Sequence, residues 1–307
     1  MTRAAACAAL IAICGQASAQ DGDAITLIVP YDPAGPTDIM VRAIADLMEE
    51  ELGSSVIVAN SSGGGGIVGM EQALASAPDG KTAGLYLTNT LVGMATGAAP
   101  FGMEDIAPAC MFAETPLAVA GIGGEEALSG LEDLLATEDA RLAIERGTLS
   151  QLAGLLMEDA SGHQFQLIAV EAGPDKVMSV LDGLVTAVVT PLPGVIREHE
   201  TGEFRILGVL SDERLERMPD LPTAREQGVD LSMIQSFGFM FPAGTPEPDI
   251  DAFCDTVETA TQDADFRALM DALGVDLRFL RGVNYGEYMR EQRERIADLA
   301  AIAGFGG

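Results

Sequence analysis

Two turns contain the residues of this chain that are best suited to bind an anion. The first turn, Tyr31–Asp38, reads Tyr-Asp-Pro-Ala-Gly-Pro-Thr-Asp and stands between β-forming residues 25–30 and an amphipathic run at 39–52. A turn that leads from a strand into a helix leaves backbone N–H groups unpaired, and these groups attract anions together with the helix dipole. We therefore expect the first turn to form half of a ligand site.

The second turn, Glu145–Ser150, lies between a β-rich run at 141–144 and a helical run that begins at Gln151. Thr148 or Ser150 can cap that helix, the free amides of the turn can face a ligand, and Arg146 can add charged donors. An ordinary helix start with a surface arginine would give the same pattern. The similarity of the two turns favours a site between them.

Side chains suited to catalysis are few. The two histidines, His163 and His199, stand in polar surroundings, and no G-x-S-x-G, H-E-x-x-H or Cys/His metal pattern occurs. In so acidic a chain most carboxylates are solvated surface groups. The sequence therefore predicts a binding protein that is not an enzyme and that uses no metal or other cofactor. The alternative is a secreted α/β enzyme for carboxylated substrates, with His163 or Glu171 as its acid or base.

Two glycine motifs resemble nucleotide-binding patterns without their context. Gly64–Gly69 fits G-x-G-x-x-G, but Thr88-Asn89-Thr90 stands about 20 residues later, where an acidic residue should hold the ribose. Gly80-Lys81-Thr82 resembles the end of a P-loop, but it leads into a strand, whereas a P-loop opens a helix. We expect no nucleotide cofactor.

The formal net charge of the whole chain is −30. A surface this acidic repels nucleic acid and anionic membranes, so neither is expected as a partner. An anionic ligand must then be held by local amides and hydroxyls, because the field of the whole protein opposes it.

Residues 1–19 have the pattern of a secretory signal peptide. Arg3 precedes a short apolar segment, and Ala17-Ser18-Ala19 forms a small-x-small cleavage signal. Ile13 stands before Cys14, where a lipoprotein signal needs a small residue. We expect export to the periplasm and cleavage after Ala19.

The mature part, residues 20–307, is long enough for one large α/β domain or two smaller ones, and no further membrane span is expected. It retains two of the four cysteines, Cys110 and Cys254. A disulfide and two buried free thiols both remain open for this pair, because the sequence does not fix their separation.

Short β-rich runs alternate with helical runs along the mature chain. The strands are expected at 25–29, 55–59, 83–88, 111–120, 141–144, 165–170, 186–190, 204–209 and 237–241. The helices are expected at 38–52, 69–77, 150–161, 174–182, 246–273 and 285–302. This alternation is typical of an α/β fold with mainly parallel sheets, in which ligands bind at the carboxyl ends of the strands.

The last two helical runs follow the last expected strand, which indicates that the chain returns to its first lobe. We expect lobe 1 to comprise residues 20–120 plus 236–307 and lobe 2 to comprise residues 121–235. The chain should cross between them near Met111–Gly121 and Ser232–Phe241. A cleft between the lobes is the natural place for a small ligand.

A series of motifs, in order over nearly the whole mature chain, resembles the extracytoplasmic solute receptors of tripartite tricarboxylate transporters, the TctC or Bug family. The motifs are residues 29–31, 35–38, 60–69, 77–82, 181–185, 202–209, 218–228 and 241–246. The resemblance implies a two-lobed periplasmic binding protein, type II-like, that closes on a small carboxylate. It also implies that main-chain amides and hydroxyls from opposed loops hold this ligand.

Carried over by position, the resemblance implies a set of ligand-binding residues in both lobes. In lobe 1 they are Tyr31, Ala34, Gly35, Pro36, Thr37, Asp38, Thr88, Asn89 and Phe237. In lobe 2 they are Gly147, Thr148, Ser150, Glu171, Ala172, Gly173, Thr190 and Pro191, with Arg146 from the second turn. Asp38 is expected to fix the first turn as well as, or in place of, touching the ligand.

Three positions depart from the family pattern. Gln151 stands where many members have a histidine, Glu171 where many have a lysine or another non-acidic residue, and Ser236-Phe237 where an aromatic pair with tryptophan is common. A carboxylate near the cleft disfavours multiply charged anions. We therefore expect a monocarboxylate, or a ligand with an amino or other neutral polar end, rather than a tricarboxylate.

The resemblance implies a monomeric receptor that delivers a small organic acid to the membrane subunits of a tripartite tricarboxylate-type transporter. A liganded protein that signals to a membrane sensor kinase would have the same fold, and this second output stays open.

Overall fold

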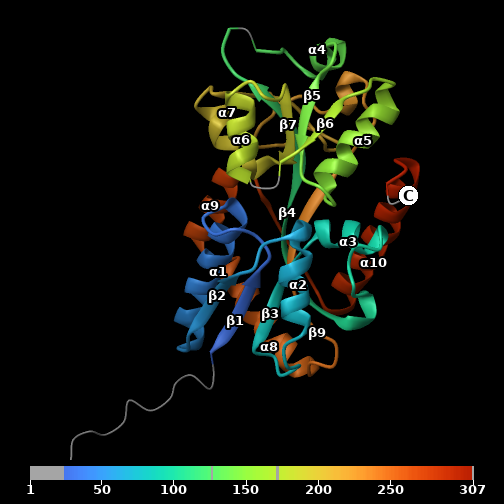
Figure 1. The fold of residues 1–307 in the computed structure, drawn as a ribbon. Helices are drawn as coiled ribbons and strands as arrows, with labels where there is room; N and C mark the ends of the chain where they lie inside the picture. Colours follow the sequence, from blue (N-terminus) through green and yellow to red (C-terminus); the bar gives the residue numbers. More distant parts are fainter. Residues whose placement is uncertain (1–23, 126, 171–172, 306–307) are drawn as a thin grey trace, which may run out of the picture.

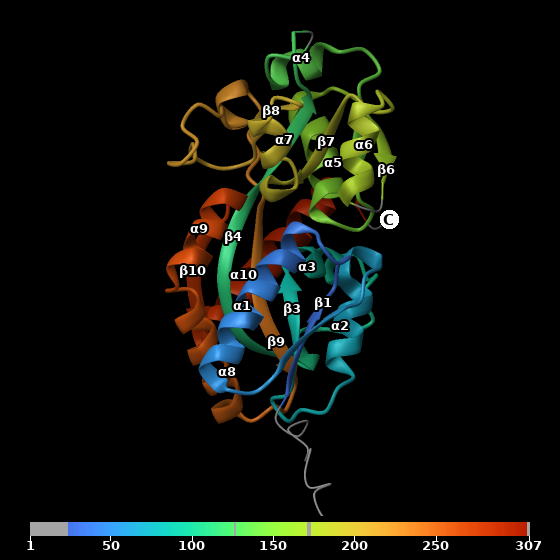
Figure 2. The ribbon, with the colours of Figure 1, turned by 90° about the vertical axis from the view of Figure 1, so that its left-hand side faces the viewer.

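The computed structural model describes residues 24–125, 127–170 and 173–305. Figure 1 shows two groups of helices and strands, one above the other. The lower half comprises β1–β3, β9, β10, α1–α3 and α8–α10, and the upper half comprises β5–β8 and α4–α7. Strand β4 (Ile106–Ile122) runs through both halves, and β9 lies beside it (Figure 2). The signal peptide expected at residues 1–19 lies outside the described residues.

The lower half is built on a mixed sheet. Strand β1 (Ile25–Val29) pairs in parallel with β2 (Val56–Asn60) and β3 (Thr82–Leu87). Strand β9 (Ile234–Pro242) pairs antiparallel with both β3 and β4, and β10 (Asp276–Arg281) pairs antiparallel with β4. The parallel strands therefore lie at one flank, and the strands that reach the upper half are antiparallel.

The upper half continues from the second part of β4. Here β4 pairs antiparallel with β7 (Ala187–Pro191) and β8 (Phe204–Val209). Strand β5 (Arg141–Ile144) pairs in parallel with β7 and β6 (Gln166–Ala169). The expectation of mainly parallel sheets holds for one flank of each half, whereas the central strands and the opposite edge strands, β10 and β8, pair antiparallel.

Helices cover both faces of this sheet. In the lower half they are α1 (Pro36–Leu52), α2 (Ile67–Leu74), α3 (Thr88–Ala95), α8 (Glu247–Ala260), α9 (Ala264–Leu273) and α10 (Gly282–Ile302). In the upper half they are α4 (Leu131–Ala136), α5 (Leu149–Ser161), α6 (Gly173–Leu181) and α7 (Ile196–Glu200). The described helices include none that is long and apolar enough to cross a membrane.

Helix α1 shows how the sequence positions the first turn. Pro36 stands at the start of the helix, where its missing N–H costs nothing, and Gly53 ends it in a left-handed conformation with φ 64°. Met40, Ile44 and Met48 recur every four residues and are fully or almost fully buried in the lower core. Burial of each side chain contributes roughly 1.5–3 kcal/mol, which holds the start of the helix in place.

The structure corrects the sequence-based elements after residue 246. The single long helix expected at 246–273 is two helices, because the side chain of Asp263 accepts hydrogen bonds from Asp265 N and Phe266 N and caps α9. Strand β10 was not expected at all. Its sequence Asp-Leu-Arg-Phe-Leu-Arg begins with the period-two alternation of a strand, and Leu277 and Phe279 pack on the lower core.

The two cysteines of the mature chain lie next to each other. Cys110 on β4 and Cys254 on α8 are both buried, and both are free thiols in this structure. Burial, and then a hydrogen bond with the Cys254 thiol, raise the pKa of Cys110 well above its usual value. Of the two states that the sequence leaves open, this structure therefore has the two buried free thiols.

Candidate ligand-binding site

The first turn is fixed by its own side chains. Asp38 is 2% exposed. It accepts hydrogen bonds from Ala34 N, Arg42 Nε and Asn60 Nδ2, each at 2.8 Å. Burial alone would raise the pKa of Asp38, but the hydrogen bonds from Arg42, Ala34 and Asn60 outweigh it and lower the pKa. Asp38 therefore holds the turn, which agrees with the structural part of its expected role.

Ala34 adopts an unfavourable backbone conformation in this turn. Its φ is 65°, in the left-handed region that disfavours residues with a Cβ atom. The neighbouring Gly35 precedes α1 in an extended conformation, and its carbonyl accepts the Ile39 N–H at 3.0 Å. Pro36 and Thr37 form the first residues of α1 and are partly exposed. The turn thus presents the start of a helix at the carboxyl end of β1.

Tyr31 connects the first turn to the glycine-rich loop and to α3. Its hydroxyl accepts a hydrogen bond from Asn89 Nδ2 at 2.7 Å and donates one to Gly65 O at 3.4 Å. Burial, and then the negative charge of Glu145, raise the pKa of Tyr31 far above its usual value. The tyrosine of the lower half therefore lies near a carboxylate of the upper half.

Asn89 joins the two halves directly. Its Oδ1 accepts a hydrogen bond from Leu149 N at 2.9 Å, at the start of α5. Because its Nδ2 binds Tyr31, one side chain links the carboxyl ends of β1, β3 and β5. These are the strand ends at which an α/β protein binds its ligand.

The glycine-rich loop serves close packing. Gly65 has φ 66°, and a Cβ built on it would lie 2.9 Å from Thr148 Cγ2 and 3.4 Å from Gly147 O. A Cβ on Gly69 would lie 2.7 Å from Pro30 Cα. Glycine is therefore required where this loop meets the second turn and β1, and the run needs no nucleotide to explain it.

Thr148 of the second turn caps α5 as expected, but amide groups of this turn already donate hydrogen bonds to nearby side chains. Thr148 Oγ1 accepts a hydrogen bond from Ser150 N at 3.2 Å. Glu145 N donates to Ser150 Oγ, and Gly147 N donates to Gln151 Oε1, both at 2.9 Å. The expectation of free amides is wrong for these groups, because nearby side chains satisfy them. Arg146 is exposed.

Thr88 and Phe237 are structural residues in this arrangement. Thr88 Oγ1 accepts a hydrogen bond from Ser236 N and contacts Ser236 Oγ, both at 2.8 Å, and thereby joins α3 to β9. Phe237 is 2% exposed and packs in the lower core, with its ring centroid 6.4 Å from that of Phe112. The assignment of Phe237 to the ligand site is therefore corrected, because its ring is enclosed by the core.

The remaining expected residues that the structure describes lie in the upper half. Thr190 and Pro191 form the carboxyl end of β7, and Thr190 is 9% exposed. Glu171 and Ala172 lie outside the described residues, and Gly173 begins α6. The position of Glu171 relative to the ligand thus stays a prediction.

Three polar residues near these strand ends were not singled out from the sequence as ligand contacts. Glu145 Oε2 lies 3.0 Å from Lys176 Nζ, and this pair joins the end of β5 to α6. Gln235 on β9 is 1% exposed, and neither atom of its side-chain amide has a hydrogen-bond partner within the described parts of the chain. It lies opposite Thr115 in β4, where the chain passes from one half to the other.

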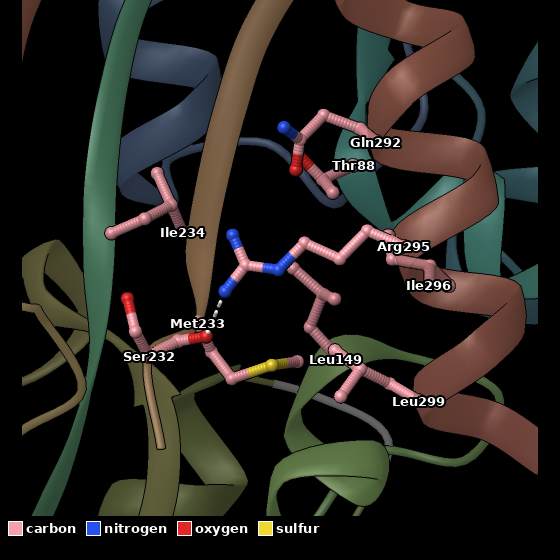
Figure 3. A pocket seen from close by; sticks show the side chains of 9 residues that line it. All are labelled: Thr88, Leu149, Ser232, Met233, Ile234, Gln292, Arg295, Ile296 and Leu299. Atoms are coloured by element: carbon pink, nitrogen blue, oxygen red, sulfur yellow. Dashed lines mark hydrogen bonds between the residues drawn. The ribbon is translucent and has the colours of Figure 1, made fainter. Parts of the chain in front are cut away.

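A small cavity lies between α10, the start of α5 and the crossing part of β9 (Figure 3). It is lined by Thr88, Leu149, Ser232, Met233, Ile234, Gln292, Arg295, Ile296 and Leu299. Arg295 reaches from α10 across it, and its Nη2 donates to Ser232 O at 2.9 Å. The cavity measures about 10 Å³, which has room for one water molecule and not for an organic ligand.

The family model described as "Tripartite tricarboxylate transporter family receptor", TctC, matches residues 40–304. The chain belongs to this family. The match begins two residues after the end of the first turn. The family assignment therefore rests on residues 40–304 and not on the first turn. The resemblance drawn from the sequence motifs is confirmed.

Relatives and solved structures agree with this assignment. The chain is 31% identical to protein BugT of Bordetella pertussis over 234 residues, which cover 72% of this chain and 71% of BugT. It superposes on the periplasmic binding protein BugD with a TM-score of 0.84 and 23% identity, covering 92% and 97% of the two chains. It also superposes on MatC from Rhodopseudomonas palustris with bound malate, with a TM-score of 0.80 and 23% identity, covering 90% and 98%. The TctC/Bug fold expected from the sequence is thereby confirmed.

Proposed function

We propose that this protein captures a small organic carboxylate between its two halves and presents it to the membrane subunits of a tripartite tricarboxylate-type transporter. TctC proteins are periplasmic substrate receptors, which supports the general role. The observation that carries the proposal is the link from Tyr31 through Asn89 to Leu149. It joins the first and second turns, one from each half, at the carboxyl ends of three strands.

In this proposal the lower and upper halves of the structure are the two lobes of the receptor. Lobe 1 comprises residues 20–120 plus 236–307, lobe 2 comprises residues 121–235, and β4 and β9 connect them. The Asn89–Leu149 hydrogen bond and the contact of Gly65 with Thr148 cross the boundary. Both contacts would break if the two lobes moved apart, so each couples the position of one lobe to the other.

The ligand class is supported by the chemistry of the first turn. The start of α1 provides a helix N-terminus, which favours a carboxylate group. Asp38 does not oppose such a ligand, because its charge is paired with Arg42 at 2.8 Å. MatC, which shares this fold, holds the dicarboxylate malate. Gln235, with both amide atoms unpaired, is the group of β9 that we assign to the same ligand.

The protein acts without catalysis in this account and works as a monomer after signal cleavage behind Ala19. Binding of the ligand and its delivery to the membrane subunits are the output of the protein in this proposal.

Thermal-shift and calorimetric titration of residues 20–307 with mono-, di- and tricarboxylates tests the proposal. An acid at 100 times its Kd should stabilise the protein by about 2.7 kcal/mol. The methyl ester or amide of the same acid, which lacks the charge, is the control and should give little shift. If no acid in the series stabilises the protein beyond its uncharged control, the proposed function is wrong.

A further inference from the structure

A largely buried ion pair in the upper half joins the end of β5 to α6. The Lys176 and Glu145 side chains are 6% and 16% exposed, with Nζ 3.0 Å from Oε2. Among the described residues, Lys176 is the only lysine or arginine that is buried. Lysine is rarely buried unless it is paired, and replacing a buried pair by apolar residues is often neutral or stabilising. Such a pair at a strand end suggests a role in binding.

The pair lies where the two halves meet. Glu145 begins the second turn, and Thr148 Oγ1 donates to its carbonyl at 2.8 Å. The same turn packs on Gly65, whose carbonyl accepts a hydrogen bond from the Tyr31 hydroxyl at 3.4 Å. The effect of Glu145 on the pKa of Tyr31 supports this proximity. A ligand between the turns would therefore lie beside Glu145 and Lys176.

The other charges of the two turns are engaged or directed to solvent. Arg42 is paired with Asp38, and Arg146 is exposed. Lys176 is therefore the buried cation that can meet a ligand carboxylate. If such a carboxylate took Lys176, Glu145 would lose its partner in a mostly buried position, which is costly. A cationic group on the ligand would restore that partner.

We propose that Glu145 and Lys176 select a zwitterionic ligand of the α-amino acid class, with its carboxylate at Lys176 Nζ and its ammonium at the Glu145 carboxylate. The inference rests on the proposed receptor function and specifies its ligand. The two protein charges are 3.0 Å apart, so they match ligand charges separated by one carbon atom better than charges at the ends of a long chain. The exchange conserves net charge, because one internal ion pair becomes two.

A simple monocarboxylate fits this pair less well. It would place two carboxylates on one ammonium, in a chain whose net charge is already −30. A dicarboxylate would add a further negative charge beside Glu145. Both therefore leave an uncompensated anion that an α-amino acid does not leave.

Calorimetric titration of the mature protein with matched acids tests the inference. The pairs are alanine with propionate, leucine with 4-methylpentanoate, and glutamate with glutarate, each differing by the amino group alone. The amino acid of the best-binding pair should bind at least tenfold more tightly than its partner. In Glu145→Gln this ratio should fall at least fivefold, and Lys176→Gln should weaken both members.

Arg214→Gln is the matched control, because it breaks an upper-half ion pair with Glu226 in which both side chains are 45% exposed. It should leave the ratio unchanged. If either single variant does not fold, as judged by circular dichroism, the Glu145→Gln/Lys176→Gln double variant removes both charges and should abolish the preference. Equal or tighter binding of the acid without the amino group by the wild type overturns the selection and leaves the receptor function standing. Binding of neither acid in any pair overturns the selection and, if the wider carboxylate series also fails, the function.

Discussion

Replacing Asp38 by asparagine should destabilise the protein strongly, although the two side chains have the same size. Three donors surround the carboxylate, from Ala34, Arg42 and Asn60, each at 2.8 Å. An amide offers one acceptor oxygen and places an NH₂ group against at least one donor. A buried donor left unpaired costs about 1–3 kcal/mol, and the loss of the charge adds to this. We expect Asp38→Asn to lower the free energy of unfolding by about 3 kcal/mol.

The control is Arg42→Gln. The Arg42 side chain is 47% exposed, so solvent screens its charge, and Arg42→Gln leaves the Ala34 and Asn60 donors on Asp38; its loss should therefore cost less than that of the Asp38 carboxylate. Urea unfolding of the wild type and both variants, followed by circular dichroism at pH 7, gives the two differences. Equal effects of the two substitutions would refute the view that all three donors, and not Arg42 alone, make the Asp38 carboxylate important.

The pH dependence provides a second check on Asp38. A carboxyl whose pKa is lower in the folded state stabilises that state above its unfolded pKa, and the contribution is lost as the pH falls through the folded pKa. The usual pKa is 3.8, and the folded value lies below it. The difference between wild type and Asp38→Asn should therefore be constant from pH 5 to 7 and shrink below about pH 4. A difference that grows on acidification would contradict the lowered pKa.

Four further substitutions and one control, Gly97→Ala, give additional tests. Ala34→Gly should raise the free energy of unfolding by roughly 0.5–1 kcal/mol, measured in urea, because glycine adopts φ 65° without strain. Gly65→Ala should weaken ligand stabilisation in a thermal-shift assay because its Cβ would meet Thr148, whereas Gly97→Ala, with φ 72° and nothing within 4 Å, should cost stability but not binding. Gln235→Leu should stabilise the free protein by about 1–2 kcal/mol, by removing an unpaired buried amide, and weaken binding in calorimetry. Phe237→Ala should cost about 3–5 kcal/mol of stability without changing which acid binds, since its ring lies in the core.

Much of the scaffold could be predicted from local patterns. The strand, turn and proline-led helix from residue 25 to 52 are encoded by neighbouring residues, and Thr148 was correctly expected as a possible cap of α5. The order of the motifs was enough to indicate the receptor family. Such features depend on residues a few positions apart, so a single sequence contains them.

Features that depend on distant residues could not be predicted in this way. Glu145 pairs with Lys176 only because α6 folds back on the end of β5. Phe237 is a core residue because of the register of β9 with Leu87 and Ala113, and no local pattern shows this register. The engaged amides of the second turn follow from the rotamers of Ser150 and Gln151, which a sequence does not specify.

Strand β10 is a different case, because its alternation was present in the sequence. The run Asp276–Arg281 follows a long helical stretch and lies between α9 and α10. It pairs with β4 at the edge opposite β9. This strand is short and lies between two segments with strong helical patterns, so its alternation is a weak signal beside theirs.

The most direct test of the central claim is a crystal structure of residues 20–307 with the tightest-binding acid. The account predicts that the carboxylate lies between the two turns, within hydrogen-bonding distance of groups from both halves, with the Asn89–Leu149 link intact beside it. An acid bound to one half alone, or at a site away from Tyr31 and Glu145, would contradict the account.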